Sequence, residues 1–384
     1  MKRLLFVVGV VLPLFFLSSC SSVPQNSVQI TRGAWSHFKR TFIMNGRVFR
    51  PHNSFDTVSE GEAYGMLRAA LVGDRETFDA CFAWTDRHLS RLERHGDHLL
   101  AWHYGQIDGK PQLLDSKAAS DADVDYAYSL ILAWRQWHDE RYMVAARDVL
   151  DSVLELETRR YGGRLYFLPW PASYNDESTG LVELNPSYYS PSHFKLFYEV
   201  THDPRWLELV DTTYDLMGRL LSDTLQQGGV VPDWVTIDLQ GNLVSVPGKP
   251  VAYGWDAVRV PLRIAADYHL HGDERALAVL RWFASWFERQ KSGGESAEPV
   301  DREKQNALFF SAEYAALEAV GSPFAAEVLQ KLRERIHQKE DGYYFDLDDD
   351  YYINSLSWLP DFYQSNSSRR QMVRGKQASL PPNL

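Results

Sequence analysis

The 384-residue sequence predicts an all-α fold whose helices occur as consecutive pairs. Apolar residues recur at helical spacing through most of the chain. Within each pair, a short Gly/Asp or His/Asp connector places Asp at or near the start of the second helix, which is typical of helical hairpins. Long segments rich in aromatic residues, Gly and Pro separate several of the pairs. Six such pairs predict an (α/α)6 barrel with its long loops gathered at one end.

Five hairpins can be delimited from these connectors. They are Gly61–Val72 with Arg75–Leu92, Asp121–Trp137 with Glu140–Leu156, Ser192–Val200 with Pro204–Leu221, Trp255–His269 with Glu274–Arg289, and Ala307–Val320 with Pro323–His337. A first helix near Gly33–Thr41 and a last helix near Tyr351–Leu359 complete a sixth pair. This pair joins the two ends of the chain and closes the ring.

The long connections are Arg94–Ala118, Arg159–Pro191 and Gly228–Gly254. Each is rich in aromatic residues, Gly and Pro, and Arg164–Phe167 is typical of a short strand. Functional residues concentrate in such loops, so these three segments are expected to form the catalytic end of the barrel. No linker composition interrupts the chain between Thr31 and Tyr363, which predicts one domain over residues 31–364.

The N-terminus predicts a processing segment over residues 1–19. Lys2 and Arg3 precede the apolar run Leu4–Leu17, which is too short for a comfortable membrane span. The run ends in Leu17-Ser18-Ser19-Cys20, which resembles a bacterial lipobox. We therefore expect Cys20 to be the lipidated first residue of the mature chain, with a plain secretory signal as the alternative.

These features predict a periplasmic protein that is tied to a membrane through its lipid anchor only. Ser21 after the cysteine favours the outer membrane. Residues 20–30 are expected to form a tether, and residues 365–384 a disordered tail, because both are rich in small and polar residues.

The composition restricts the ligand class. The formal net charge of −11 argues against nucleic acid and other anionic polymers. The 12 Trp and 20 Tyr residues suit a cleft that stacks sugar rings, although large cores also use aromatic residues. Beyond Cys20 the chain contains only Cys81, which lies in a helical apolar pattern and is expected in the core. No pattern in the sequence demands a metal or an organic cofactor.

The segment Ala119–Tyr128 places three carboxylates at alternate positions before an apolar helix. Helical geometry directs Asp121 and Asp125 to one face and turns Asp123 away from them. Carboxylates this close repel one another, which a protein tolerates most readily beside a cationic partner or a polar ligand. A capped and solvated helix start is the alternative interpretation.

Two further segments present acids in the same structural context. Val58–Met66 contains Glu60 between small residues at a helix entrance, and Tyr253–Pro261 contains Asp256 with Arg259 one turn later. Each acid is expected at the start of the first helix of a hairpin, after a long loop. In an (α/α)6 barrel these helix starts converge on one end of the barrel axis.

Together these motifs resemble glycoside hydrolase family 8, and within it the periplasmic endoglucanases of bacterial cellulose-synthesis systems. The resemblance rests on Ser59-Glu60-Gly61-x-x-Tyr64-Gly65-Met66, Ala119–Asp123, Asn185-Pro186-Ser187-Tyr188, Pro232-Asp233-Trp234-Val235 and Asp256–Val260. Weaker similarities at Ala101–Gly105 and Tyr351–Leu356 extend it over nearly all of residues 31–363. The order of the motifs along the chain is the order found in the family.

The resemblance implies an inverting hydrolase in which Glu60 is the general acid and Asp256 the general base. It implies a place for Asp121 at the central sugar-binding site. We further expect substrate contacts from Trp102, Tyr188, Arg259, Asp123 and Tyr64. Core packing is the alternative for Trp102 and Tyr188, a supporting role is the alternative for Asp123, and a structural clamp on the Asp256 loop is the alternative for Arg259.

The expected activity is endo-acting hydrolysis of a β-1,4-linked, cellulose-like polysaccharide in the cell envelope. A link to exopolysaccharide production, with a synthase or export complex as a partner, is expected from the same resemblance. Cleavage of xylan or chitosan, a polysaccharide lyase and a non-catalytic polysaccharide-binding lipoprotein are the alternatives. The chain departs from many relatives at Glu62, where they often carry Gln, and in the loop Arg159–Glu183.

Overall fold

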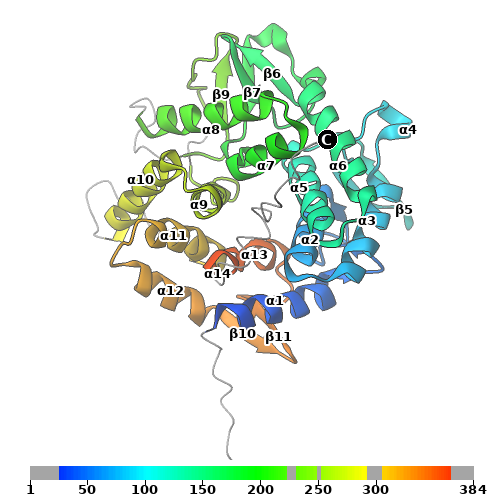
Figure 1. Cartoon of the computed structure of the whole chain (residues 1–384), viewed down its shortest axis with the longest axis vertical. Helices are drawn as coiled ribbons and strands as arrows, with labels where there is room; N and C mark the ends of the chain where they lie inside the picture. Colours follow the sequence, from blue (N-terminus) through cyan, green and yellow to red (C-terminus); the bar gives the residue numbers. More distant parts are fainter. Residues whose placement is uncertain (1–25, 223–230, 249–251, 292–304, 365–384) are drawn as a thin grey trace, which may run out of the picture.

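The helices of the computed structural model form two concentric rings (Figure 1). The structure describes residues 26–222, 231–248, 252–291 and 305–364. The inner ring contains α2 (Ser59–Val72), α5 (Ser120–Trp137), α7 (Pro191–Thr201), α9 (Arg259–His271), α11 (Ala307–Ala319), α13 (Tyr351–Leu356) and α14 (Leu359–Gln364). The outer ring contains α1 (Ser27–Phe42), α3 (Arg75–Leu89), α6 (Glu140–Leu156), α8 (Arg205–Ser222), α10 (Glu274–Lys291) and α12 (Ala325–Glu334).

Contacts between successive inner helices close the ring. Helix α2 contacts α5, and the contacts continue through α7, α9 and α11 to α13, which returns to α2. Helix α1 packs on α13 and α14, so the first and last helices pair as the sequence predicted. The architecture confirms the predicted (α/α)6 barrel.

The hairpin connectors end four of the inner helices, α2, α5, α7 and α9, in a left-handed backbone conformation. Gly73 and Gly272 adopt positive φ at the ends of α2 and α9, where glycine has no steric penalty. His138 and His202 do the same at the ends of α5 and α7, with φ of 54° and 58°. Asp74, which follows Gly73, then accepts from the Thr77 N–H and caps α3.

Several helix boundaries differ from the predicted ones; for example, α12 ends at Glu334, and His337 lies in the strand that follows it. Helix α1 begins at Ser27 because the Asn26 side chain caps it, so residues 27–30 of the expected tether are helical and Ile30 is fully buried. The last inner helix is divided into α13 and α14. Helix α9 begins only at Arg259, so Asp256 lies in a turn before the helix and not at its first residue.

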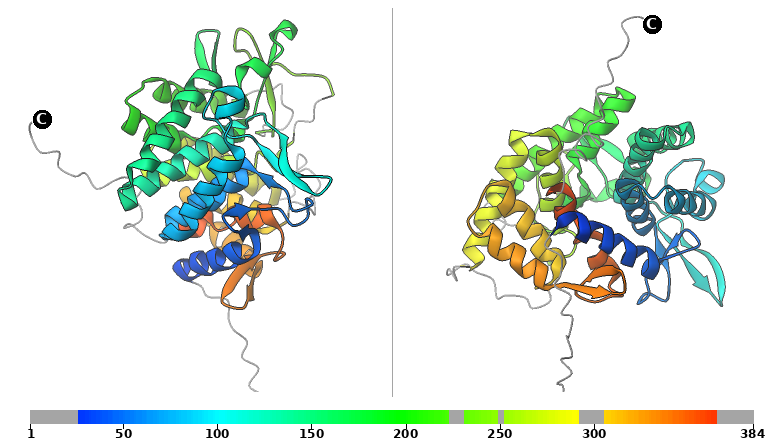
Figure 2. Two further views of the ribbon diagram at one scale, coloured as in Figure 1. Left: turned by 90° about the vertical axis from the view of Figure 1, so that its right-hand side faces the viewer. Right: turned by 60° about the horizontal axis from the view of Figure 1, so that its bottom comes forward.

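Short antiparallel strands organise the loops. The paired strands are β1 (Ile43–Met44) with β2 (Arg47–Val48), β3 (Thr57–Val58) with β4 (His103–Ile107) and β5 (Lys110–Asp115), β6 (Thr158–Tyr161) with β7 (Arg164–Phe167), β8 (Leu181–Leu184) with β9 (Val235–Asp238), and β10 (Ile336–Lys339) with β11 (Gly342–Phe345). A short helix, α4 (Leu92–His95), and three 3-10 turns (Ala172–Tyr174, Glu177–Thr179, Pro186–Tyr188) complete the loops. The strand expected at Arg164–Phe167 is β7, and Figure 2 shows the β4–β5 hairpin projecting from the barrel.

The pairing of β8 with β9 brings two of the long loops together. Leu184 lies opposite Val235 in this sheet. As a result, the segment after β8, which contains Asn185 and Tyr188, lies beside the segment before β9, which contains Asp233 and Trp234. These residues are about fifty positions apart in the sequence.

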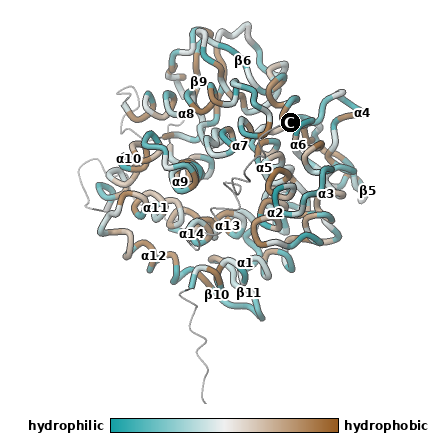
Figure 3. The backbone as a smooth tube through the Cα atoms, viewed as in Figure 1, coloured by the Kyte–Doolittle hydropathy of each residue, from teal (hydrophilic) through white to brown (hydrophobic). Residues whose placement is uncertain are grey.

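How much of a helix is buried depends on the ring in which it lies. The inner helix α5 is buried at every residue from Ser120 to Ala133, because it contacts helices of both rings. The outer helix α6 buries one face and exposes the other, and Figure 3 shows this mixture of hydrophobic and hydrophilic residues around the outer ring. Cys81 is fully buried in the core, as predicted. No helix in the described ranges is both long and apolar enough to cross a membrane.

Asn354 fixes the start of α13, which carries two aromatic residues to the cleft. Its carboxamide Nδ2 donates to the carbonyl oxygens of Leu347 and Asp350, both at 2.8 Å, and its Oδ1 accepts from the Phe345 N–H at 2.8 Å. Because Asn354 is buried, these bonds set the path of the preceding loop. Tyr352, two residues earlier, donates from its hydroxyl to the Trp255 carbonyl at 2.9 Å.

Candidate active site

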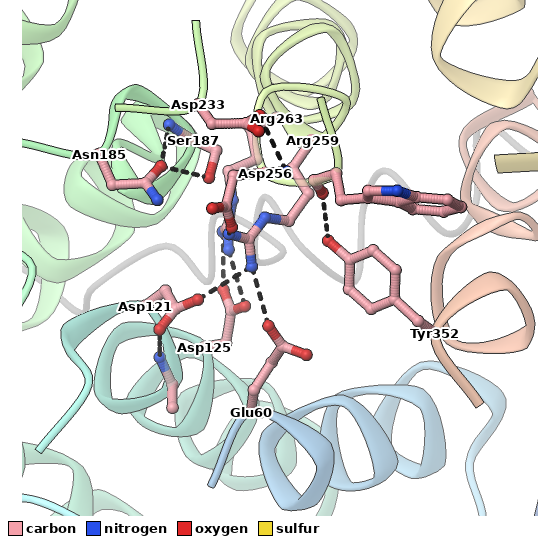
Figure 4. Close-up of polar contacts among 12 residues, drawn as sticks. Glu60, Asp121, Asp125, Asn185, Ser187, Asp233, Asp256, Arg259, Arg263 and Tyr352 are labelled. Atoms are coloured by element: carbon pink, nitrogen blue, oxygen red, sulfur yellow. Dashed lines mark hydrogen bonds and ion pairs between the residues drawn. The ribbon is translucent and has the colours of Figure 1, made fainter. Parts of the chain in front are cut away.

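Three carboxylates from separate elements converge on one guanidinium group (Figure 4). Arg259 Nη1 donates to Glu60 Oε2 and to Asp121 Oδ2, each at 2.9 Å. Its Nη2 donates to Asp256 Oδ1 at 2.5 Å. Glu60 lies in the first turn of α2, Asp121 in the first turn of α5, and Asp256 in the turn before α9. The structure therefore brings together the three acids that the sequence predicted for the catalytic centre.

Arg259 is the centre of this arrangement and not a residue of the cleft surface. Its side chain is only 3% exposed, and the guanidinium lies 5.3 Å from the centre of the Tyr188 ring. The expectation that Arg259 contacts substrate is corrected, because its donors are directed at the three carboxylates. The structure shows the clamp that was the alternative.

Burial raises the pKa of both Glu60 and Asp121, and neighbouring charges oppose this shift or add to it. Burial raises the pKa of Glu60 to about 7, with the cation of Arg259 opposing the shift and the carboxylates of Asp121 and Asp256 adding to it. Burial also raises the pKa of Asp121, against the effect of Arg259 and Arg263. A carboxyl group with a pKa of about 7 can hold a transferable proton at neutral pH.

A second ion pair lies one helical turn below the first. Arg263 donates to both oxygens of Asp125, at 2.8 and 2.9 Å, and a ring nitrogen of His193 lies 3.2 Å from Asp125 Oδ1. Burial disfavours the charge, but Arg263 and His193 hold the pKa of Asp125 well below its usual range. Asp125 is thus an ionised support beneath the site.

Asp123 faces away from the cleft, which corrects its assignment as a substrate contact. Its side chain is fully buried, and Oδ1 accepts from the Leu100 N–H at 2.7 Å. Glu62, the departure noted in the sequence, is also fully buried. It accepts from the Val48 N–H at 2.7 Å and from the Thr85 hydroxyl at 3.4 Å. Neither carboxylate contributes to the cleft surface.

Tyr64 also lies below the cleft floor and not on its surface. The residue is 5% exposed and lines a separate cavity of about 50 Å³ together with Asp125, His193, Arg259 and Arg263. This position corrects the expectation that Tyr64 contacts substrate.

A cleft of about 420 Å³ opens beside Glu60 and Asp256. Its other lining residues are Arg50, Pro51, His52, Asn53, Trp255, Asp349, Asp350, Tyr351 and Tyr352. Trp255 is 42% exposed and offers an aromatic face. Trp170 stacks on Trp234 at 5.9 Å, and Trp234 packs edge-on against Tyr188 at 6.1 Å. Tyr188 is half-buried next to Arg259, and a sugar contact by its ring stays a prediction.

Trp102 lies beside the first residue of α2. Its carbonyl accepts from the Ser59 N–H at 3.0 Å, next to Glu60. The half-buried ring stacks on His103 at 4.5 Å. A sugar contact by this ring stays a prediction.

Three charged or titratable residues that line the cleft, Arg50, His52 and Asp350, each have a hydrogen-bond or ion-pair partner. Arg50 donates to both oxygens of Asp56, at 2.8 and 2.5 Å. His52 lies 3.0 Å from Asp349. Asp350 caps α13 through the Ile353 N–H. Such a surface suits a neutral ligand, since Arg50, which lines the cleft, already binds both oxygens of Asp56 and is not left to attract an acidic sugar. Over the described ranges, no group of three or more His, Cys, Asp or Glu residues is arranged to hold a metal ion.

The contacts around Asp256 include two residues whose roles the sequence did not reveal. Trp234 Nε1 donates to Asp256 Oδ2 at 3.1 Å. Asp233 Oδ1 accepts from the backbone N–H groups of Gly254, Asp256 and Ala257. Both residues belong to a motif that carried the family resemblance, but no chemical function followed from the motif alone.

The family model described as "Glycosyl hydrolases family 8" matches residues 10–366. The chain belongs to glycoside hydrolase family 8. It is 30% identical over 277 residues to an endoglucanase of Salmonella typhi, which covers 71% of this chain and 72% of that protein. It is 28% identical over 284 residues to a beta-glucanase of Niallia circulans, with 69% and 67% covered.

A solved structure is similar to this chain in fold as well as in sequence. The endo-1,4-D-glucanase from Vibrio fischeri ES114 aligns with a TM-score of 0.70 at 26% identity, over 85% of this chain and 93% of that chain. Membership of family 8 makes this protein a glycoside hydrolase and confirms the resemblance found in the sequence motifs. It also accounts for three acids at the catalytic end of an (α/α)6 barrel.

Behind the cleft wall, Asp123 and Glu157 form a buried pair of carboxyl groups. Among the described residues, no hydrogen-bond partner is recorded for Asp123 Oδ2 or for either oxygen of Glu157. Burial raises the pKa of both groups well above the ordinary value, and the Asp123 carboxylate adds to the shift at Glu157. The remaining charged neighbours are Arg91, Asp97 and Asp121. The pair therefore retains a proton after exposed carboxyl groups have ionised.

We predict that this pair makes stability fall as pH rises. A carboxyl pKa raised in the folded state gives stability that is complete below the unfolded pKa and is lost as pH rises through the folded pKa. Glu157→Gln replaces a titratable carboxyl group with an amide that does not titrate, so its free energy of unfolding should depend less on pH. The difference from the native protein should grow by up to about 1.4 kcal/mol per pH unit. Urea denaturation between about pH 5 and 9 measures the free energy of unfolding of the variant and of the native protein. Glu155→Gln is the control, because Glu155 is exposed in the last turn of α6, two residues before Glu157. Parallel curves for Glu157→Gln and the native protein would contradict the assignment.

Proposed function

We propose that this family 8 enzyme cleaves internal bonds of a neutral β-1,4-linked glucan with inversion, using Glu60 as general acid and Asp256 as general base. The observation that carries the proposal is the placement of Glu60 and Asp256 on the wall of one cleft, joined through the two terminal nitrogens of Arg259. Inverting enzymes hold their two carboxyl groups roughly 6.5–9.5 Å apart, so that a water molecule fits beside the sugar. The two acids bind different terminal nitrogens of one guanidinium, which holds their carboxyl groups apart, and the stereochemical test below distinguishes inversion from retention.

Each group then has one task. Glu60 gives its proton to the glycosidic oxygen as the bond from that oxygen to the anomeric carbon breaks. Asp256 takes a proton from a water molecule whose oxygen bonds to the anomeric carbon on the opposite face. The Asp256 side chain is 32% exposed, so water can reach it. Arg259 also binds Asp121, whose side chain is only 4% exposed, and the place of Asp121 at the central sugar-binding site rests on the family motif.

The substrate class is supported by the relatives and by the cleft. The relatives named above are called endoglucanase, beta-glucanase and endo-1,4-D-glucanase. The paired charges favour a neutral polymer over a uronate-containing one, which weighs against a lyase. Trp255 and the Trp170–Trp234 stack offer faces on which sugar rings stack well. Xylan and chitosan are the competing substrates.

We also propose that the enzyme is anchored by lipid at Cys20 and acts in the periplasm, with the outer membrane favoured, in connection with exopolysaccharide production. Support comes from Lys2 and Arg3, the apolar run Leu4–Leu17 and the lipobox. These residues, the first part of the tether and the tail over residues 365–384 lie outside the described residues. A synthase or export complex is the partner that this location suggests.

The first test of the activity is stereochemical. A short β-1,4-glucan oligosaccharide should release the α-anomer first, because water attacks the face opposite the leaving group. Proton NMR of the earliest products measures the anomer. Assays on soluble glucan, xylan and chitosan establish the substrate, and a rapid fall in viscosity indicates internal cleavage. Retained β configuration would reject the inverting pair, and binding without turnover on all three polymers would favour the non-catalytic alternative.

The second test concerns the proton on Glu60. Since the acid must be protonated, kcat/KM should fall as pH rises above about 7, the pKa to which burial raises this group. Glu60→Gln should lower kcat by ~10²–10⁴-fold while oligosaccharide binding persists, and Asp256→Asn should do the same. Glu62→Gln is the matched control, because Glu62 lies on the same helix but faces Val48 and Thr85. Near-normal turnover by Glu60→Gln would refute the mechanism.

The third test concerns the anchor. Mass spectrometry of the mature protein from a Gram-negative host should find a diacylglyceryl group on Cys20 as the first residue. Cys20→Ala should abolish this modification and release the protein from the membrane fraction. An unmodified N-terminus, or cleavage at another position, would overturn the localisation and leave the proposed activity untouched.

A further inference from the structure

The turn that carries Asp256 is held by a carboxylate from another loop. Three backbone N–H groups of this turn, those of Gly254, Asp256 and Ala257, point at one oxygen of Asp233, with distances of 3.1, 3.1 and 2.7 Å. The turn itself is closed by the Val258 N–H, which donates to the Gly254 carbonyl at 3.1 Å. Asp233 therefore satisfies donors just before α9, as a capping residue would do.

The fit between Asp233 and the turn is close. A Cβ atom added to Gly254 would lie 2.1 Å from Asp233 Oδ2 and 2.9 Å from its Cγ. Glycine is needed here because the carboxylate packs directly on the backbone. The φ angle of Gly254 is not in the left-handed region, so space and not backbone conformation is the constraint.

Trp234, the residue after Asp233, binds the side chain of Asp256, which the turn carries. Its indole Nε1 donates to Asp256 Oδ2 at 3.1 Å, while Arg259 binds Oδ1. The indole is itself supported by stacking on Trp170 and by edge contact with Tyr188. Both oxygens of Asp256 are thus directed by donors whose own positions are fixed.

The dipeptide Asp233-Trp234 is anchored by its surroundings. The Asp233 N–H donates to the Ala252 carbonyl at 3.1 Å. Val235, the first residue of β9, pairs with Leu184 of β8. The pairing of Val235 in the sheet therefore fixes the dipeptide from outside the turn that it holds.

We propose that Asp233 and Trp234 are positioning residues for the catalytic base: Asp233 fixes the backbone under Asp256, and Trp234 fixes the direction of its carboxylate. The inference rests on the proposed role of Asp256. A base displaced by about 1 Å can cost ~10²-fold in rate, because the water it activates is no longer aligned with the sugar. Asp233 and Trp234 act on the chemical step through Asp256, so substrate affinity should be nearly unchanged.

The first set of variants separates positioning from general stability. Asp233→Ala should lower kcat by ~10²-fold with KM changed less than about threefold. Asp233→Asn keeps an oxygen acceptor and should recover most of that loss. Trp234→Phe keeps an aromatic ring but loses the N–H, and it should lower kcat by roughly tenfold, the effect of one hydrogen bond to a charged group.

Asp238→Ala is the matched control. Asp238 ends β9 and accepts from the Gln240 and Asn242 N–H groups at 2.9 and 2.8 Å, so it organises a turn in the same way but away from the site. Its kcat should stay within about twofold of the native value. Thermal unfolding of every variant shows that each is folded under assay conditions.

A double-mutant cycle tests the contact itself. Gly254→Ala should displace the Asp233 carboxylate and lower kcat in the same way as Asp233→Ala. In the Asp233→Ala background the added methyl group has space, so Gly254→Ala should cause little further loss. Near-normal kcat for Asp233→Ala, or losses from the two changes that simply multiply, would overturn the proposal. If Asp256→Asn itself retains turnover, it is instead the role of the base that fails.

Discussion

The active centre depends on one buried cation. Glu60, Asp121 and Asp256 come from three separate elements and would repel one another without Arg259, which binds all three. Burying a charged group is costly unless its partners are close and well aligned, and here the guanidinium presents several donors in a fixed plane. The same cation tempers the effect of burial on Glu60, whose pKa of about 7 lies near neutral pH. One guanidinium thus sets both the geometry and the protonation of the centre.

Helices α5 and α9 meet through two successive ion pairs that repeat at the same spacing. Asp121 binds Arg259, and four residues later on each helix Asp125 binds Arg263. The spacing of four residues keeps both pairs on the facing sides of the two helices. The upper pair opens toward Glu60, Asp256 and the cleft, whereas the lower pair is closed off by His193. The lower pair therefore supports the upper one from within the barrel.

The loops supply the rest of the active centre, namely the turn that carries Asp256 and the residues around it. The inner helices bring acids and arginines to one end of the barrel axis, but the base lies in a turn outside any helix. The β8–β9 pairing places Asp233, Trp234 and Tyr188 around that turn and around Arg259. Small antiparallel strands are rigid enough for this task because their backbone donors and acceptors are paired.

The sequence by itself determined the ring of helical hairpins, because apolar periodicity and the Gly/Asp and His/Asp connectors are local signals. It also identified Glu60, Asp121 and Asp256, whose motifs are short and continuous. Only the tertiary structure decided which way side chains point: it turned Asp123, Glu62 and Tyr64 into the interior and made Arg259 a clamp. Asp233, Trp234 and Arg263 could not be assigned functions from sequence, because their partners lie between 20 and 140 positions away. Such contacts arise only when the barrel and its loops are assembled, and no local pattern records them.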